Sequence, residues 1–551
     1  MHRSLAGIVL ASLILTILGG CKMDQSSETV PVAAEPVPVV LQLAGEYPLR
    51  NDAVSVDVSD TVVNTVVQGL FGANLSHRGN GYNIYNPETD SFHEAIMAQL
   101  KASGVSHLRY PGGIQGDYIH WNESVGENRI PQIDPFSASF PVNADKDGES
   151  YVIEFGPDEF ARLCAEAGVQ ATVHLNAGNG SAEQAADWVR YYKEKGVDVA
   201  SFCVGNEVCM AEERVEGMTV TKTPVEYVEF YKEVWKALDG AADGIEFGAI
   251  GITPSHPLNK YRQWDATVIA GLADKLDFID VHIGYTPYFV NEGTPDEDVL
   301  RCMMASSTFV KLLIEEEKNI IANNAGQYAD DISIQITEWG PLGGKYSNGV
   351  AGALYAASFL NTVTVEPKVS SACYLPLINH YDAANLLGSR TDGGRDEHWD
   401  NCVTFVFRMY ARQTGRQVLS ANVTGCKTFD SKRVGLVPGL SDIPDGEATV
   451  YFDPATGEGS IFLLNKSLED AVSFQVQLPF QKVRLHSVEE IWDENPAVRN
   501  SYLDKQQFAP VVTQLDQQLT DGKLTVQSKP LSLLKIDFTV SDSENARREA
   551  A

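Results

Sequence analysis

Basic residues are scarce in this sequence of 551 residues. It holds 42 Lys and Arg against 74 Asp and Glu, which gives a formal net charge of −32 at pH 7. Such a surface repels the phosphates of nucleic acids and anionic lipid head groups. The composition therefore argues against a nucleic-acid-binding protein. An anionic ligand would need Arg or Lys concentrated at its own site.

Metal and cofactor motifs are missing as well. No CxxC pair and no His-rich spacing is present, so we expect no metal site and no cofactor. No Gly-x-Gly-x-x-Gly opens a helix after the first expected strand, which removes the usual dinucleotide role. Seven cysteines remain after Cys21 is set aside, so at least one is free or pairs with another molecule. A disulfide between Cys402 and Cys426 stays open.

A membrane-spanning run is also lacking. The apolar stretch Leu5–Leu18 is shorter than the ~20 residues that a spanning helix needs. It follows the basic start Met1-His2-Arg3 and precedes Leu18-Gly19-Gly20-Cys21, which resembles a bacterial lipobox. The resemblance implies that 1–21 is a lipoprotein signal peptide whose Cys21 carries a lipid. An ordinary signal peptide is the alternative.

The residues after this signal suggest how the mature chain is held. The segment 22–44 is rich in Ser, Glu, Pro, Val and Ala without a helical or strand period, so we expect a flexible tether. The protein would then be anchored through lipid in the cell envelope of a Gram-negative bacterium, at the outer membrane or facing the periplasm.

Strand-like runs alternate with helical stretches from residue 70 onward. Most runs are continuous and rich in Val, Ile, Leu and Phe, as in parallel strands buried on both faces. The expected strands are Leu70–Ser76, Val105–Tyr110, Gln170–Asn176, Ala200–Gly205, Ile245–Thr253, Leu276–Tyr285, Ile332–Trp339 and Ser371–Leu377. The expected helices are Ser91–Ser103, Pro157–Ala167, Ala182–Lys195, Pro224–Leu238, Val299–Ala322 and Gly349–Val363. Eight strands alternating with helices predict an α/β fold, the (β/α)8 or TIM barrel; a doubly wound open sheet is the alternative.

The pattern changes near residue 415, where strand-like stretches follow one another. Turns such as Asp453-Pro454-Ala455-Thr456-Gly457 separate them, which predicts a C-terminal antiparallel β-sandwich. The segment 45–68 also has strand character and is expected to join that sandwich. The predicted division is therefore a barrel over 69–412, a sandwich over 413–541 and a disordered tail over 542–551.

Polar side chains stand at the ends of nearly all barrel strands. Catalytic groups of a barrel come from these C-terminal ends. The candidates are Asn74, Arg109, His174, Asn176, Asn206, Glu207, His282, Tyr285, Glu338, Trp339 and His380.

Two of these candidates, Glu207 and Glu338, close apolar runs on the expected fourth and seventh strands, which face each other across a barrel. Glycoside hydrolysis needs such a pair, about 5–5.5 Å apart for retention and about 6.5–9.5 Å apart for inversion. Like charges this close do not both ionise cheaply, so one carboxyl group is expected to stay protonated.

The motifs around these residues resemble a known group of enzymes. Gly205-Asn206-Glu207 and Thr337-Glu338-Trp339-Gly340 are similar to the acid/base and nucleophile motifs of the clan of retaining glycosidases with (β/α)8 barrels. Within it, the chain resembles the α-L-arabinofuranosidase-like family most closely. That similarity includes Leu108–Gly113 followed by Asp117, Trp121 and Val125-Gly126, the stretch 406–412, and 462–467 in the expected sandwich.

The resemblance implies a role for each matched residue. It makes Glu207 the general acid/base and Glu338 the nucleophile, with Asn206 on the sugar 2-hydroxyl. Arg109 should lie near Glu338 and keep it ionised. The remaining expected roles are positioning of Glu338 or the sugar by His282 and Tyr285, and a platform for a sugar face on Trp339.

The chain also departs from the family pattern. Asn74 stands where arabinofuranosidases carry a Glu that grips the sugar, and Thr-Glu-Trp-Gly replaces their usual Asp-Glu-Trp-Asn. The Gly-rich segment 388–399 includes Arg390 and could bind a uronate or sulfate, or be a loop with self-paired charges.

The leading hypothesis is a retaining glycosidase of plant or algal polysaccharides that resembles α-L-arabinofuranosidases. The alternatives are a related barrel enzyme for an anionic or modified sugar, such as a uronidase or an anhydrosugar- or galactan-type enzyme, and a non-catalytic glycan-binding surface lipoprotein. The sequence leaves open the sugar, its anomer, exo or endo action and the oligomeric state.

Overall fold

The computed structural model describes residues 39–133, 150–210, 220–378, 384–390 and 397–541. The expected signal peptide with Cys21, the first part of the tether, the tail 542–551 and the candidate residue His380 lie outside these ranges. Within them, no helix is both long and apolar enough to cross a membrane.

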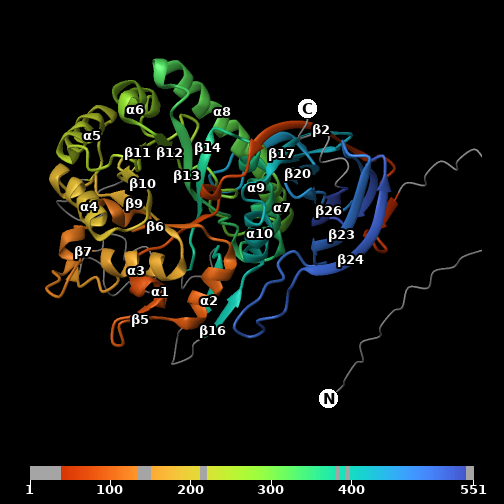
Figure 1. Ribbon diagram of the computed structural model, residues 1–551, viewed down its shortest axis with the longest axis horizontal. Coiled ribbons are helices and arrows are strands. Elements are labelled where there is room, and N and C mark those ends of the chain that lie inside the picture. The colour runs from red at the N-terminus through yellow and green to blue at the C-terminus, as the bar shows by residue number, and fades with distance from the viewer. Residues whose placement is uncertain (1–38, 134–149, 211–219, 379–383, 391–396, 542–551) are drawn as a thin grey trace, which may run out of the picture. The chain divides into compact units, whose positions relative to one another are not determined.

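The predicted barrel is confirmed. Its eight parallel strands close in the order β10-β11-β12-β13-β14-β3-β6-β9, and the helices surround them in Figure 1. The strands are β3 (Gly72–Asn74), β6 (His107–Tyr110), β9 (Gln170–Leu175), β10 (Val199–Val204), β11 (Glu246–Ile250), β12 (Phe278–Asp280), β13 (Ser333–Trp339) and β14 (Val369–Tyr374). Each of the eight lies within or overlaps an expected strand, because a strand covered by helices outside and by side chains inside is apolar throughout.

The barrel helices begin where capping residues predict. In α4 (Ala182–Lys195) the Ser181 side chain accepts the backbone N–H of Gln184, and in α5 (Pro224–Leu238) the Thr223 side chain accepts that of Glu226. Such side chains satisfy N–H groups that the helix itself leaves unpaired. The other long helices are α2 (Glu94–Ser103), α3 (Pro157–Ala167), α6 (Trp264–Leu272), α7 (Asp296–Met304), α8 (Ser306–Asn324), α9 (Val350–Thr364) and α10 (Cys402–Ala411).

One expected helix is divided in the structure. The stretch Val299–Ala322 forms two helices, α7 and α8, that meet at Ala305. The backbone N–H of Ala305 bonds to both Arg301 O and Cys302 O, so the last turn of α7 tightens before the chain turns into α8. Apolar spacing continues through the break, which is why the sequence reads as one helix.

A second sheet holds ten strands in the order β1-β25-β22-β2-β17-β20-β21-β26-β23-β24. They are β1 (Val39–Gln42), β2 (Val54–Thr65), β17 (Gln417–Thr424), β20 (Gly446–Phe452), β21 (Glu458–Asn465), β22 (Val472–Gln477), β23 (Lys482–Ile491), β24 (Val511–Thr520), β25 (Lys523–Ser528) and β26 (Ser532–Val540). Apolar residues from strands at both ends of this order share one core, so the sheet folds over itself. The predicted antiparallel sandwich is confirmed, with two parallel pairings, β1 with β25 and β2 with β22.

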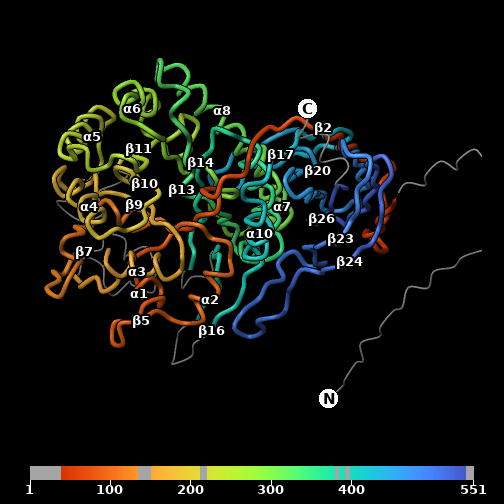
Figure 2. The backbone as a smooth tube through the Cα atoms, viewed as in Figure 1, coloured from red at the N-terminus to blue at the C-terminus, as the bar shows by residue number. Residues whose placement is uncertain are grey.

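The N-terminal strands tie the start of the chain to this sheet. In Figure 2 the red strand β2 runs beside β17, and the two pair antiparallel. Strand β1 occupies residues that we expected in a flexible tether. That expectation is wrong for residues 39–42: Leu41 is buried in the sheet core, and four residues are too short for a strand period to be seen in the sequence.

Helix α9 is buried along its whole length, because it packs against the barrel and the second sheet. A buried ion pair of the second sheet lies at this contact, and hydrogen bonds from the barrel helices reach it. Lys466 Nζ lies 2.8 Å from Glu447 Oε1, and Ser307, Ser358 and Asn361 of α8 and α9 also donate to Glu447. Against the effect of burial, Lys466 lowers the pKa of Glu447 to about 2.

The seven cysteines of the described residues are all free, and six of them are buried. The open possibility of a bond between Cys402 and Cys426 is not realised. Cys402 lies at the start of α10, whereas Cys426 contacts the backbone of Gly446 in the second sheet.

Candidate active site

The two candidate glutamates meet at the C-terminal end of the barrel. Glu338 lies in β13, and Glu207 follows the last residue of β10 by three positions. One carboxylate oxygen of each and a ring nitrogen of His282, which follows β12, lie within 4.8 Å of one another. The side chain of Glu207 is 19% exposed and that of Glu338 is 6% exposed, so Glu207 is the more accessible of the two.

Glu338 is held in its ionised form by its neighbours. Arg109 Nη1 donates to Oε1 at 2.8 Å, and the Tyr285 hydroxyl donates to Oε2 at 2.6 Å. Burial alone would raise the pKa of Glu338, but His282, Arg109 and the Tyr285 hydroxyl together lower it. A carboxylate that stays negative in a nearly dry site is suited to nucleophilic attack.

His282 lies between the two glutamates. Its Nδ1 is 2.8 Å from Glu207 Oε1 and 3.5 Å from Glu338 Oε2. Although burial opposes it, the negative charges of Glu338, Glu207 and Asp280 raise the pKa of His282. The imidazole therefore couples the two carboxyl groups electrostatically. The sequence predicted that His282 lies near Glu338, but it did not predict the contact of His282 with Glu207.

Arg109 is the centre of a hydrogen-bond network beneath the glutamates. Its fully buried guanidinium also donates to Asn74 Oδ1 at 2.6 Å, to Asn206 Oδ1 at 2.5 Å and to His174 Nε2 at 2.9 Å. The five N–H donors of an Arg side chain can satisfy such a set at once. The Asn206 Nδ2 group is buried and has no hydrogen-bond partner among the described residues.

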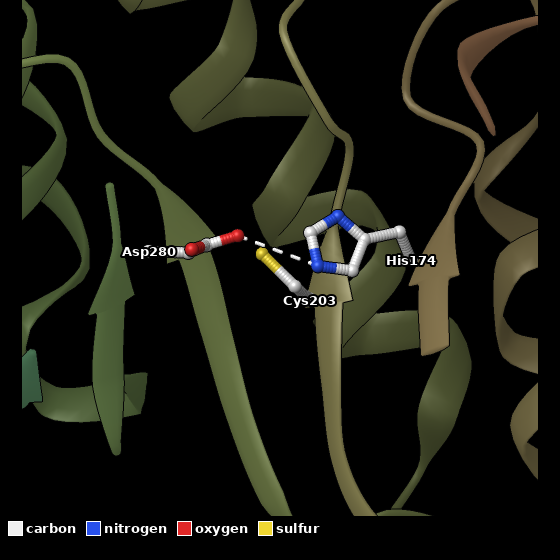
Figure 3. A group of neighbouring side chains, drawn as sticks. All are labelled: His174, Cys203 and Asp280. Atoms are coloured by element: carbon white, nitrogen blue, oxygen red, sulfur yellow. Dashed lines mark ion pairs between the residues drawn. The ribbon is translucent and has the colours of Figure 1, made fainter. Parts of the chain in front are cut away.

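A second cluster lies inside the barrel. His174, Cys203 and Asp280 project from β9, β10 and β12 toward one another, as Figure 3 shows, and all are buried. His174 Nε2 lies 3.3 Å from Asp280 Oδ2. Burial and the nearby charge of Arg109 hold the pKa of His174 far below its usual range, so this contact joins a neutral imidazole to the carboxyl group rather than an ion pair.

Both clusters have the residue types of a metal site, yet hydrogen-bond donors already occupy several of their ligand atoms. Arg109 donates to Nε2 of His174, and Arg109 and Tyr285 donate to the two oxygens of Glu338. A cation at either cluster would also face the guanidinium charge. The donor sets therefore fit a hydrogen-bonded network better than a bound ion.

The structure corrects three of the expected sugar contacts. Asn74 is engaged by Arg109 and donates to Thr337 O at 2.8 Å, so its amide is fully used. Asn176 organises its own loop, since its Oδ1 accepts the backbone N–H groups of 178–180. Trp339 is fully buried and stacks on Phe359 with a centroid distance of 3.8 Å, so its ring offers no platform to a sugar.

The expected anion-binding segment is described only in part. The Arg390 guanidinium carbon lies 3.8 Å from the ring centroid of Tyr502, a cation–π contact. Residues 391–396 lie outside the described residues, as does His380. The described part of the segment therefore directs Arg390 toward an aromatic ring.

Two residues that contact the site were not among the candidates: Asp280, and Asp117, which was named from the sequence only as part of the family-like motif. Asp280 accepts the Thr337 hydroxyl at 2.7 Å and its backbone N–H at 3.2 Å, and Asp117 accepts the backbone N–H groups of Asn206 and Glu207. The signal for Asp280 was present: it interrupts an apolar strand two residues before His282, on the same face of that strand.

A closed eight-stranded barrel with two carboxyl groups this close at its C-terminal face is the arrangement of a glycoside hydrolase. Known proteins agree. Residues 97–240 match the family model of the α-L-arabinofuranosidase 1 domain, and residues 328–532 match that of the α-L-arabinofuranosidase C-terminal domain.

Curated relatives are also named as arabinofuranosidases. The chain is 22% identical over 513 residues to an intracellular exo-α-(1→5)-L-arabinofuranosidase of Halalkalibacterium halodurans, covering 85% of this chain and 95% of that one. It is 24% identical to an enzyme of the same name from Bifidobacterium longum, over 57% of each chain.

Solved structures show the same fold. The family 51 α-L-arabinofuranosidase of Bifidobacterium longum superposes with a TM-score of 0.73 at 20% identity, over 89% of this chain and 100% of that chain. The family 51 arabinofuranosidase of Xanthomonas axonopodis pv. citri gives a TM-score of 0.72 at 19% identity, with the same coverage. The protein is an arabinofuranosidase-like glycoside hydrolase.

The expected location in the cell envelope is wrong by the same comparison. The exo-α-(1→5)-L-arabinofuranosidases of Bifidobacterium longum, Acetivibrio thermocellus, Halalkalibacterium halodurans, Streptomyces lividans and Bacillus subtilis are named as intracellular enzymes. The prediction rested on the N-terminal segment, namely its basic start, its apolar stretch and the lipobox-like Leu18-Gly19-Gly20-Cys21.

Proposed function

We propose that the protein hydrolyses α-L-arabinofuranosides of plant or algal oligosaccharides with retention of anomeric configuration. The observation that supports this most directly is the closeness of the two glutamates. An oxygen of Glu207 lies within 4.8 Å of an oxygen of Glu338. Such a separation fits the retaining route, which places the carboxyl groups about 5–5.5 Å apart, better than the about 6.5–9.5 Å of inverting enzymes.

The two carboxyl groups take different parts in this reaction. Glu338, kept negative by Arg109, Tyr285 and His282, attacks the anomeric carbon. Glu207 transfers its proton to the glycosidic oxygen as the bond to the leaving group breaks. A covalent glycosyl-enzyme results, and Glu207 then takes a proton from the water that attacks the same carbon, which frees Glu338.

Asn206 and Arg109 support the transition state. The Nδ2 group of Asn206 can donate to the sugar 2-hydroxyl, while Arg109 holds its Oδ1. A hydrogen bond to the 2-hydroxyl strengthens as the sugar becomes oxocarbenium-like. The same guanidinium holds Glu338, so nucleophile and sugar contact are aligned by one buried group.

A second candidate is the same chemistry on another sugar. It is favoured by Asn74, which stands at the position of a sugar-gripping Glu and is engaged by Arg109 and by the carbonyl of Thr337. A pocket without that carboxylate has less to hold the hydroxyl groups of an arabinofuranose. Xylosides, galactosides and glucuronides therefore belong in the test.

The test is hydrolysis of aryl glycosides of these four sugars by the wild type, Glu338→Ala and Glu207→Ala. We expect Glu338→Ala to fall to background. Glu207→Ala should lose about 10²- to 10⁴-fold on poor leaving groups and regain turnover on activated ones with azide. Glu246→Ala is the matched control, because Glu246 begins β11 at the opposite end of the barrel. Unchanged rates in both site variants would refute the assignment.

A further inference from the structure

A buried carboxylate lies behind the residue that we assign as acid/base. Asp117 ends the 3-10 helix η2 (Ile114–Asp117) and has no exposed surface. Its Oδ1 accepts the backbone N–H of Asn206 at 3.1 Å, and its Oδ2 accepts that of Glu207 at 3.0 Å. One side chain thus bonds to two consecutive peptide groups, both of them in the candidate active site.

Glu207 needs such a support because it lies outside the barrel ladder. Strand β10 ends at Val204, and Gly205 makes the last bond to the neighbouring strand, from its N–H to Leu175 O at 2.8 Å. Beyond that point, the backbone N–H groups of Asn206 and Glu207 have Asp117 as their acceptor. Among the described residues, the Glu207 side chain has a hydrogen bond to His282 only.

The backbone around Asp117 is packed too closely to shift. Asn179 N–H donates to Asp117 O at 3.2 Å, and a Cβ at Gly178 would lie 2.1 Å from that oxygen. Gly205 has a φ of +88°, and a Cβ there would lie 2.9 Å from the Cβ of Ala177. Segments that follow β6, β9 and β10 therefore meet at Asp117, and glycines permit the approach.

The charge of Asp117 matters for this arrangement. Burial raises its pKa to about 7, while the two N–H groups and Arg109 act in the opposite direction. A carboxylate can accept from two N–H groups at once, one on each oxygen. An amide cannot, since its NH2 group would face one of the two donors.

From this geometry we propose that Asp117 is the positioning residue of the acid/base, fixing the 206–207 peptide so that the Glu207 carboxyl group reaches the glycosidic oxygen. The proposal rests on the function proposed above. The other groups of the site have separate supports: Arg109 holds Glu338 and the Asn206 side chain. Loss of Asp117 therefore impairs proton transfer more than it impairs attack.

This difference can be measured as a dependence of kcat/KM on the leaving group, which a merely structural role of Asp117 would not produce. Two glycosides of the same sugar are compared, one with a 2,4-dinitrophenolate leaving group, which needs no proton, and one with methanol as the leaving group, which does. We expect Asp117→Asn to lower kcat/KM about 10- to 100-fold on the methyl glycoside and less than about 3-fold on the dinitrophenyl glycoside. Because deglycosylation also needs Glu207, added azide should raise kcat of the variant on the dinitrophenyl glycoside.

Asp265→Asn is the matched control. Asp265 is also buried, its pKa is also raised to about 7 by burial, and it accepts a backbone N–H, that of Ile252 at 2.6 Å. It lies in α6, away from the 206–207 peptide, so its variant should show no dependence on the leaving group. If Asp117→Asn does not fold, Asp117→Glu keeps the charge but displaces the carboxylate, and the same split is expected.

The outcomes separate this proposal from the function on which it rests. Glu207→Ala should lose more activity on the methyl glycoside than on the dinitrophenyl glycoside. If it does, but Asp117→Asn loses activity equally on both glycosides or loses none, then positioning by Asp117 is refuted while the proposed function stands. If the wild type cleaves neither glycoside of any sugar, or Glu207→Ala shows no split, both proposals fall.

Discussion

The hydroxyl group of Tyr285 offers a quantitative test of how Glu338 is kept ionised. It donates to Glu338 Oε2 at 2.6 Å inside a buried site. Tyr285→Phe removes this donor and keeps the ring that stacks on Tyr288. A hydrogen bond to a charged group contributes about 1.5–3 kcal/mol, and about 1.4 kcal/mol corresponds to one pKa unit. Loss of the donor should therefore raise the pKa of Glu338 by about one to two.

The sign of the effect on activity follows from which form reacts. Glu338 attacks as the carboxylate, and its pKa in the folded protein is held below the ordinary value. Raising that pKa moves the acidic limb of the kcat/KM profile to higher pH by about one to two pH units, since this limb reports ionisation in the free enzyme. The assay is kcat/KM on an activated aryl glycoside from pH 3 to pH 8.

Tyr288→Phe is the control for this experiment. Tyr288 stacks on Tyr285, and none of the contacts between described residues joins its hydroxyl to Glu338. Its profile should keep the acidic limb of the wild type. An acidic limb that stays in place in Tyr285→Phe would refute the view that this hydroxyl holds the charge of Glu338.

Two further predictions concern stability. Burial, with Asp265 and Glu316 nearby, raises the pKa of Glu317 in the folded protein well above its ordinary value. Since the unfolded chain loses this proton at lower pH than the folded protein does, the free energy of unfolding falls as pH rises. Thermal melts of Glu317→Gln should fall less between pH 5 and pH 8 than those of the wild type; equal falls would contradict this. Lys466→Ala leaves Glu447 charged and buried without its ion-pair partner, so urea unfolding should show a loss of about 3–5 kcal/mol. A loss below about 1 kcal/mol would show that the pair is not buried in solution.

The barrel could be predicted because its local signals agree with its tertiary structure. Strands such as β13 are apolar along their length, and helices α4 and α5 begin at Ser181 and Thr223 as capping rules predict. The sequence did not predict the division between α7 and α8 at Ala305, because packing rather than composition decides where a continuous apolar stripe bends.

The candidate site could be predicted only as a set of side chains at one end of the barrel. The sequence places Trp339 beside Glu338, but alternation along β13 points the two side chains in opposite directions, so the ring enters the core. The hydrogen-bond partners of the site residues could not be predicted from the sequence either. Asn176 folds back on its own loop, and Asp117 reaches a peptide about ninety residues away. Only the folded chain brings these groups together.

The central claim, a retaining mechanism carried by Glu207 and Glu338, is tested most directly by the anomer of the sugar that is first released. Proton NMR of the reaction within the first turnovers, before mutarotation, reports it. We expect the product to have the configuration of the substrate, because two carboxyl groups with oxygens within 4.8 Å of each other fit the retaining route through a covalent intermediate. A product of inverted configuration would contradict the account.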